Sequence, residues 1–189
     1  DGLNERIQST SNMAEEVKGS RLVFVAVPSS SFRQVVSDMV PYMPEDAILV
    51  STTKGIEAGS FAMMSQILNQ EAPRARVGVL SGPNLALEIA KKDLAGTVIA
   101  SPDEDVREIV KSALKSKYFR VYAKNDMFGV ELGGALKNIY AIIAGIAAAL
   151  GMGHNTNSML VTRALTEMAR FGKELGADPM TFLGLAGVG

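Results

Sequence analysis

The fold class is decided by the stretch Leu22-Val23-Phe24-Val25-Ala26-Val27-Pro28-Ser29-Ser30-Ser31. Its first six residues are all apolar and do not alternate with polar ones, which is typical of a parallel β-strand covered on both faces. Pro28 ends the strand, and the serines offer N-cap hydroxyls to a helix that carries Val35, Val36, Met39 and Val40. The stretch therefore predicts a strand, a loop and a helix in succession.

The same unit recurs along the first part of the chain. Further strands are predicted at residues 48–51, 77–80, 97–100 and 119–122, and helices at residues 61–68 and 85–90. Ser101-Pro102-Asp103-Glu104 has the pattern of a capping box with proline at the first helical position, and predicts a helix with Val106, Ile109, Val110, Ala113 and Leu114 inward. Alternating strands and helices indicate an α/β fold with a mostly parallel, doubly wound sheet through about Ala123.

The rest of the chain has helical patterns only. One long helix is predicted from Phe128 to Met152 and a second from Asn157 to Leu175, with Gly176 as its C-cap. The inward face of the second helix is predicted to consist of Val161, Ala164, Leu165, Met168, Gly172 and Leu175. Asp178-Pro179 predicts the start of a third helix. The apolar run 139–153 is shorter than a membrane span, so we interpret it as part of a buried helix.

Composition excludes several classes of function. The chain has 19 Lys and Arg residues against 20 Asp and Glu residues, spread without blocks, which gives no charged surface for nucleic acid or an anionic membrane. The absence of cysteine excludes thiol catalysis, disulfides and zinc–thiolate sites, and is compatible with the cytoplasm. A single histidine cannot build a metal cluster. The expected partner is therefore a small molecule, and no metal is expected.

Polar loops follow three of the predicted strands. They read Pro28-Ser29-Ser30, Thr52-Thr53-Lys54-Gly55 and Ser81-Gly82-Pro83-Asn84. Small molecules bind at the carboxyl ends of strands in open α/β sheets, and Lys54 could meet a phosphate or carboxylate there as a point charge. The alternative is that these loops are ordinary turns with Lys54 solvated, since Gly, Pro, Ser and Asn favour turns for conformational reasons alone.

Lys137 stands alone on a helix face of small residues. At helical spacing its neighbours are Val130, Gly133, Gly134, Ala141, Ala144, Gly145 and Ala148. An ammonium on such a face loses much of its water, which lowers the pKa of a lysine toward the range of acid/base catalysis near neutral pH. The alternative is a lysine that extends to solvent from the end of a packed helix.

A phosphate loop of the Gly-x-Gly-x-x-Gly type is not found in the sequence. Gly151-Met152-Gly153 follows a helix instead of a strand and has Thr156 where the third glycine should be, so we interpret it as a helix-to-helix turn. A single histidine also gives no support for a Ser-His-Asp arrangement. The residues alone therefore indicate an α/β enzyme segment with lysine acid/base chemistry.

Six motifs occur in one order over essentially the whole chain. They are Phe24–Ser29, Thr53–Glu57, Ser81–Glu88, Gly129–Asn138, Thr162–Met168 and Gly176–Phe182. Together they resemble the bacterial NAD(P)-dependent glycerol-3-phosphate dehydrogenases. The resemblance implies that residues 1–123 are the C-terminal portion of a Rossmann-like dinucleotide-binding domain. Residues 124–189 would then be the N-terminal portion of an all-α substrate and catalytic domain.

The resemblance also implies parts that this sequence does not contain. The family's glycine-rich cofactor loop would precede Asp1, and its Ser-Arg-Asn segment, which grips the substrate phosphate, would follow the turn at Gly187-Val188-Gly189. We therefore expect a central fragment that lacks both ends and that alone turns over no NADH. Asn84 departs from the serine or threonine common in the family's Gly-Pro loop, but an amide can still hydrogen bond to substrate.

The implied reaction is hydride transfer between NAD or NADP and sn-glycerol 3-phosphate or dihydroxyacetone phosphate, in the cytoplasm, supplying glycerol 3-phosphate for phospholipid synthesis. By resemblance, Lys137 is the general base and contacts the substrate, and Asn138 orients it in the substrate site. Lys54 would lie between cofactor and substrate. Contacts to the substrate are expected from Gly82 and Asn84, and contacts to the cofactor from Pro28, Ser29 and Ala86. A homodimer is allowed.

Two alternatives stay open. One is another hydroxy-acid dehydrogenase of the same two-domain plan with a lysine in its helical domain, although the Lys54-Gly55 and Gly82-Pro83-Asn84 loops favour a phosphate substrate. The other is a non-catalytic truncated fragment that serves as a scaffold or forms a dimer.

Overall fold

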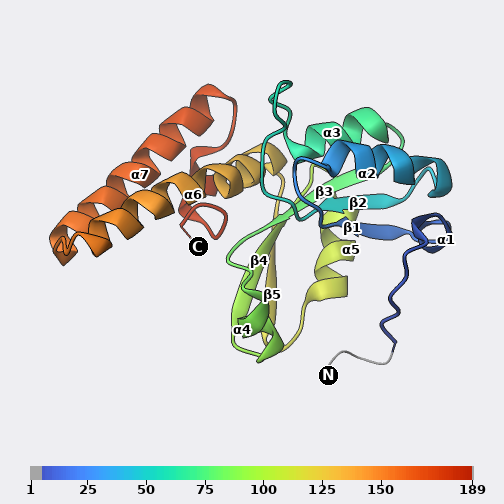
Figure 1. Ribbon diagram of the computed structural model, residues 1–189, viewed down its shortest axis with the longest axis horizontal. Helices are drawn as coiled ribbons and strands as arrows, with labels where there is room; N and C mark the ends of the chain where they lie inside the picture. The colour runs from blue at the N-terminus through green and yellow to red at the C-terminus, as the bar shows by residue number, and fades with distance from the viewer. Residues whose placement is uncertain (1–5, 189) are drawn as a thin grey trace.

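The computed structural model describes residues 6–188 of the chain. Figure 1 shows a sheet surrounded by helices in the first part of the chain, and two long helices that lie side by side, α6 and α7, in the second. Asp1 and Gly189, the terminal residues named above for the expected fragment, lie outside the described residues. The chain thus has an α/β part followed by a helical part.

The sheet of the described residues has five strands in the order β1-β2-β3-β4-β5. The strands are Leu22–Val25, Ile48–Ser51, Arg76–Ser81, Ala95–Ala100 and Phe119–Lys124. β3 and β4 pair antiparallel, whereas the other three neighbouring pairs are parallel. The mostly parallel sheet is therefore confirmed, with one reversal. The chain reverses after β3 because the short helix between them, α4 (Ala86–Ala90), buries no residue and does not cross the sheet.

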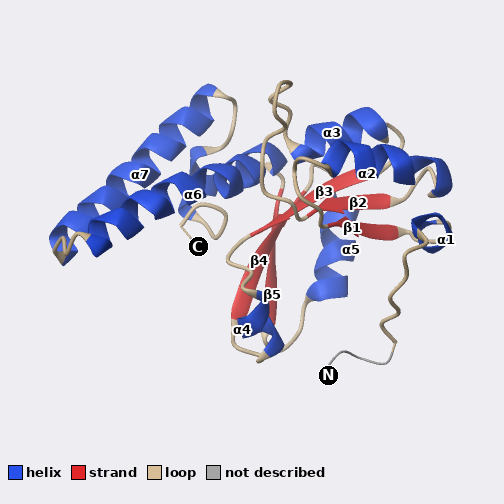
Figure 2. Cartoon of the chain, viewed as in Figure 1, coloured by secondary structure: helices blue, strands red, loops and turns tan. Residues whose placement is uncertain are grey.

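Helices cover both faces of the sheet, as a doubly wound fold requires (Figure 2). Helices α2 (Phe32–Met39) and α3 (Met64–Glu71) pack with Leu49 and Val77 on one face. Helix α5 (Glu104–Leu114) packs with Ile48 and Val50 on the other face. Leu49 lies on the opposite face from Ile48 and Val50 because successive residues of a strand point to opposite faces of the sheet. Two short elements complete this part, α1 (Met13–Val17) and the 3₁₀ turn Val40–Tyr42.

The expected helix caps are wrong in two places. The hydroxyl of Ser31 does not cap α2; it donates to the carbonyl oxygen of Pro28 at 3.1 Å. Ser101 does not cap α5 either, because its hydroxyl donates across the sheet to the carbonyl oxygen of Val77 at 2.7 Å. Asp103 takes over this role and accepts from the backbone of Asp105, so α5 begins at Glu104, after Pro102.

Several residues expected in the core are exposed. Phe61 is 80% exposed and lies in the loop before α3, which begins at Met64 instead of residue 61. Phe24 is exposed and packs against neither cluster, although Leu22 of β1 packs against the cluster around α5 and Val25 belongs to the cluster on the other face. Ile109 and Ala113 of α5 also face solvent.

The helical part consists of α6 (Met127–Ala149), α7 (His154–Glu174) and the 3₁₀ helix Pro179–Leu183, labelled η2. The third predicted helix is therefore only a short 3₁₀ turn. Its Phe182 is fully buried with Leu132 and Met168 between the three elements. Gly176 follows the end of α7 with φ +88°, which fits the glycine predicted to end that helix. The domain boundary expected at residue 123 lies at the end of β5, before α6.

The second half of α6 is not buried, which contradicts the prediction for the run 139–153. Ile142 is 64% exposed and Leu150 68%, because α7 covers only one side of α6. Val161 of α7 and Leu175, which follows α7, are exposed as well. By length and composition alone α6, with 23 residues and a mean hydropathy of 1.5, could cross a membrane. This is weak evidence, since its first half packs against β3, and the expectation of no membrane span stays a prediction.

Candidate active site

The loops after β1, β2 and β3 meet at one edge of the sheet. Thr53 donates its hydroxyl to the carbonyl oxygen of Val27 at 2.7 Å, which ties the second loop to the first. Ser29 lies so close to Gly55 that a Cβ on this glycine would be 2.7 Å from the Cβ of Ser29. The first two predicted loops are therefore in contact. The close approach of Ser29 leaves no room for a side chain at position 55, so Gly55 is needed for packing as well as for the turn.

Lys54 joins the second loop to the third. Its ammonium donates to the carbonyl oxygen of Gly82 at 3.3 Å, although the side chain as a whole is exposed. Asn84 is fixed to the sheet in turn, since its amide donates to the hydroxyl of Thr97 at 3.1 Å. Thr97 is buried and donates to the carbonyl oxygen of Ser81 at 3.0 Å. The third loop is thus held against β4 while it faces Lys54.

Helix α6 approaches this edge through two adjacent glycines, Gly133 and Gly134. A Cβ on Gly134 would be 2.7 Å from the hydroxyl oxygen of Ser81 and 3.7 Å from Cγ of Lys54. A Cβ on Gly133 would be 3.0 Å from the carbonyl oxygen of Ala186. Small residues are therefore required for α6 to lie between the strand ends and the segment after η2. This close packing brings the start of α6 to the loops.

Lys137 follows these glycines by one helical turn. It is half-buried, and its pKa is lowered first by burial and second by the positive charge of Lys54. Both causes favour the neutral amine. Two lysines that share one site attract an anion or an oxygen that gains negative charge, and the lowered pKa of Lys137 favours proton exchange by its amine. The structure therefore places both predicted lysines in one site.

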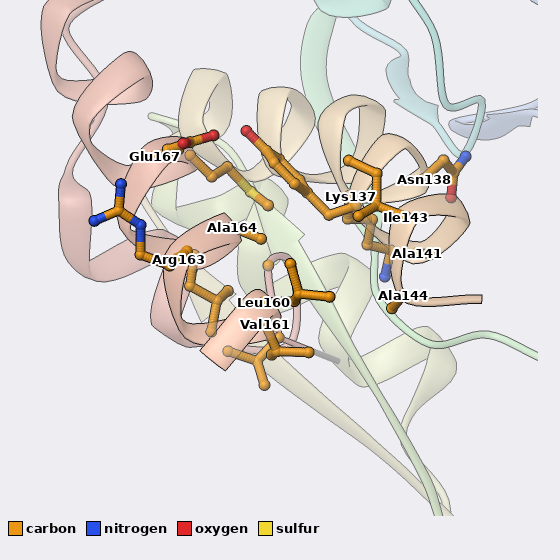
Figure 3. A pocket seen from close by; sticks show the side chains of 15 residues that line it. Lys137, Asn138, Ala141, Ile143, Ala144, Leu160, Val161, Arg163, Ala164 and Glu167 are labelled. Carbon is orange, nitrogen blue, oxygen red and sulfur yellow. The ribbon is translucent and has the colours of Figure 1, made fainter. Parts of the chain in front are cut away.

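A cavity of about 420 Å³ lies between α6 and α7, with Lys137 in its wall. In Figure 3, Ala141 and Ala144 of α6 face Leu160, Val161 and Ala164 of α7 across it. Arg163 and Glu167 of α7 also line the cavity. Lys137 therefore borders both the loops at the sheet edge and a largely apolar space.

Two predicted site residues are not gathered around Lys54 and Lys137. Asn138 is exposed and in Figure 3 points away from α7, and its amide makes no described hydrogen bond to Lys137. Ala86 is exposed at the start of α4, which Figure 1 shows beside the far ends of β4 and β5, away from α6. Pro28 is exposed beside half-buried Ser29 at the sheet edge. Within residues 6–188, no group of three or more His, Cys, Asp or Glu residues could hold a metal ion.

Sequence reasoning missed two residues of this region. Ser81 lies in the third loop, but no role was predicted for it; its hydroxyl is buried without a hydrogen-bond partner. Glu131 lies in α6 and is buried, with its carboxylate bonded to Ser65 of α3. One signal could have found Glu131, since it is the only acidic residue between Asp126 and Glu167.

Gly134→Ala is expected to lower the free energy of unfolding by about 1–3 kcal/mol, the usual cost of overpacking. The added Cβ would be 2.7 Å from the hydroxyl oxygen of Ser81, which is buried and cannot turn into solvent. In Ser81→Ala/Gly134→Ala that oxygen is gone, and the Cβ of residue 81 lies at 3.8 Å, an ordinary contact. Urea unfolding should therefore show the double variant close to wild type. Equal stability of Gly134→Ala and wild type would contradict the close approach of α6.

Two family models together match most of the chain. Residues 2–107 match the model for the N-terminus of NAD-dependent glycerol-3-phosphate dehydrogenase, and residues 126–189 match the model for its C-terminus. The chain belongs to this family. Membership confirms the resemblance that the six motifs predicted.

Members of the glycerol-3-phosphate dehydrogenase family resemble the chain over nearly its whole length. Glycerol-3-phosphate dehydrogenase [NAD(P)+] of Azotobacter vinelandii is 61% identical over 183 residues, 97% of this chain and 54% of the relative. The enzyme of the same name from Alcanivorax borkumensis is 53% identical over 99% of this chain and 54% of the relative. The crystal structure of glycerol-3-phosphate dehydrogenase from Coxiella burnetii superposes with a TM-score of 0.92 at 33% identity, over 98% of this chain and 57% of that one.

The chain spans about half the length of the curated relatives that it matches. The residues that match the N-terminal model include Lys54 and the Ser81–Asn84 loop, and those that match the C-terminal model include Lys137. Of the two alternatives, another hydroxy-acid dehydrogenase is disfavoured, because both family models belong to glycerol-3-phosphate dehydrogenase.

Proposed function

We propose that the protein containing this chain transfers hydride between NAD or NADP and sn-glycerol 3-phosphate or dihydroxyacetone phosphate. The observation that carries the proposal is the placement of Lys54 and Lys137 in one site, with the pKa of Lys137 lowered by burial and by Lys54. The names of the relatives support the substrate and the cofactor. The proposal includes a role in supplying glycerol 3-phosphate for phospholipid synthesis in the cytoplasm.

The residues at the sheet edge fit a dinucleotide. Dinucleotides bind outside the carboxyl ends of strands in this class of sheet, and Pro28, Ser29 and Lys54 lie at those ends. The contact of Ser29 with Gly55 leaves little side-chain bulk between the first two loops. When bound, the nicotinamide supplies the hydride for reduction or accepts it in oxidation. We assign a cofactor contact to Ala86 by resemblance only.

Lys137 is the proton donor and acceptor in this proposal. In reduction, it gives a proton to the C2 oxygen as the electrons of the C=O double bond move onto that oxygen. In oxidation, neutral Lys137 takes the proton from the C2 hydroxyl. A positioned cation beside this oxygen stabilises charge as the charge develops, and so lowers the barrier to reaction. Asn138, next to Lys137 in sequence, is assigned to the substrate site by resemblance.

Lys54 supplies fixed positive charge to the same site. Its ammonium donates to the carbonyl oxygen of Gly82, and by resemblance we assign it to the space between the substrate phosphate and the dinucleotide. Gly82 and Asn84 line the substrate side of this loop, with Asn84 fixed through Thr97. Binding, more than proton transfer, is therefore the role that we assign to Lys54, Gly82 and Asn84.

A chimera tests the proposed function. In it, this chain replaces the 183 matching residues of the Azotobacter vinelandii relative. The proposal predicts oxidation of NADH or NADPH that depends on dihydroxyacetone phosphate, with the unaltered relative as positive control. A chimera that unfolds in one cooperative transition but shows no such turnover would favour the non-catalytic scaffold and overturn the proposal.

Lys54→Met is expected to move the pH dependence of oxidation upward. Oxidation needs neutral Lys137, so its rate rises as pH passes the pKa of this lysine. Loss of the positive charge at Lys54 raises that pKa, because a like charge had lowered it, while the effect of burial remains. We expect the rising limb to move to higher pH, measured as kcat against pH in the chimera. If the rising limb does not shift, the charge of Lys54 does not lower the pKa of Lys137.

A further inference from the structure

Glu131 is a buried acid that the proposed reaction does not use. It is 3% exposed, and it accepts from the backbone N–H of Ser65 at 2.9 Å and from the hydroxyl of Ser65 at 2.5 Å. Ser65 is the second residue of α3, so a carboxylate from α6 satisfies the N-terminus of a helix in the α/β part. These bonds join residues that are 66 positions apart in sequence.

Burial opposes the charge on this carboxylate. It raises the pKa of Glu131, against hydrogen bonds from Ser65 and from the backbone of Met64 that lower it. An apolar side chain could occupy a buried position without this cost. The carboxylate instead makes two hydrogen bonds to one residue. These bonds constrain both the distance between α6 and α3 and the orientation of one helix relative to the other.

The two helices joined by Glu131 lead to the two lysines of the site. Lys137 lies six residues after Glu131 on the same continuous helix, or about 9 Å along its axis at 1.5 Å per residue. Lys54 lies in the loop that leads into α3. The bond between Glu131 and Ser65 is therefore a direct link between the element that carries Lys137 and the element that follows Lys54.

The loop that carries Lys54 is itself fixed to α2 and α3. Arg33 of α2 makes a bidentate pair with Glu57 of this loop, with both N–O distances at 2.7 Å. A further bond from Arg33 reaches Glu71 at the end of α3, at 2.5 Å. Movement of α3 would therefore be transmitted to the loop of Lys54.

We propose that Glu131 is a positioning residue, which sets the separation of Lys137 from Lys54 by holding the N-terminus of α3 against α6. The inference rests on the proposed function only for its effect on turnover. The titratable groups that line the cavity with Lys137 are Tyr140 on its own helix and Arg163 and Glu167 on α7, and the charge of Lys54 acts on Lys137 from the loop after β2. None of these is bonded to Glu131, so a change at Glu131 acts on Lys137 through the position of α6.

The test uses the 189-residue chain itself and the chimera. Titration of Lys137 is followed in the chain by NMR of isotope-labelled lysine side chains, and kcat is measured in the chimera. Glu131→Ala should raise the titration midpoint of Lys137, because Lys54 moves away, and should lower kcat about tenfold or more, as loss of precise positioning does. Glu131→Gln should stay close to wild type, since an amide can accept from the N–H of Ser65 and donate to its hydroxyl.

Asp103→Ala is the matched control. It removes a carboxylate that caps α5, a helix of the same α/β part with no bond to α6, so it should lower the thermal midpoint without moving the titration of Lys137 or kcat. If Glu131→Ala does not fold, Ser65→Ala, which keeps the backbone bond, should give a smaller shift in the same direction.

Failure of the inference and failure of the proposed function are distinguishable. A chimera without turnover, in which Lys137 of the chain still responds to Glu131→Ala, would overturn the function and leave the geometry intact. A chimera with turnover, in which Glu131→Ala equals Asp103→Ala in kcat and leaves the titration of Lys137 unmoved, would show that Glu131 is only a helix cap and would overturn the inference.

Discussion

Replacing Lys137 by alanine is expected to lower the kcat of the chimera at least roughly a hundredfold, the lower end of the loss when a positioned acid or base is removed. The reason is that Lys137 is the titratable group whose pKa is lowered at the meeting point of α6 and the sheet-edge loops. Affinity for the dinucleotide should change little, because the proposed cofactor contacts lie in the loops after β1 and β2 and at the start of α4, not on α6. Steady-state kinetics with dihydroxyacetone phosphate and calorimetry of dinucleotide binding measure the two effects.

Two further variants sharpen this prediction. Lys137→Arg should fail in oxidation, because a guanidinium stays charged and cannot take a proton from the substrate. Lys173→Ala, at an exposed lysine in the last turn of α7, is the control and should keep kcat. Turnover of Lys137→Ala within a few-fold of wild type would remove this residue from the mechanism.

Lys54→Ala is expected to raise the KM for dihydroxyacetone phosphate and to weaken dinucleotide binding, together with any loss of kcat. A fixed positive charge beside a bound anion contributes to the ground state and the transition state alike, so its loss appears mainly in binding. Tenfold or more in KM is the order of magnitude expected for one charge-assisted contact. Initial-rate measurements that vary each substrate in turn give both constants.

The conservative variant separates charge from geometry at this position. Lys54→Arg should restore only part of the affinity, because a planar fork does not replace a compact ammonium bonded to the carbonyl oxygen of Gly82. Lys115→Ala, at an exposed lysine after α5, is the matched control. If Lys54→Ala left both KM values unchanged, Lys54 would be a solvated loop lysine.

The sequence predicted the strands, because the pattern of apolar residues within each segment determines them. The strands predicted from the sequence correspond to the five strands of the sheet. Lys54 and Lys137 could be predicted as site residues because Lys54 is a cation in a loop of threonine and glycine and Lys137 is a cation on a helix face of small residues. The position of Lys54 could be expected once its loop was assigned to the carboxyl end of a strand.

Long-range contacts decided the features that the sequence did not predict. Ser101 stands in a helix-cap pattern, yet its hydroxyl bonds to Val77 on another strand. Ile142 and Leu150 belong to an apolar run and are exposed, since burial depends on which elements pack against α6. Glu131 bonds to a residue 66 positions away, and no local period encodes such a bond. Antiparallel pairing of β4 likewise was not predicted, because it depends on whether the connection through α4 crosses the sheet.

Rescue of Lys137→Ala by added amines tests proton transfer by Lys137 most directly. In the chimera with this substitution, small primary amines can enter the space left by the side chain and act as the acid or base in its place. The account predicts that they restore part of the turnover, and that the restored rate, at constant amine size, varies with the pKa of the amine. Turnover that stays at the level of Lys137→Ala at every amine concentration, while the variant remains folded and binds dinucleotide, would contradict the assignment of Lys137 as the group that moves the proton.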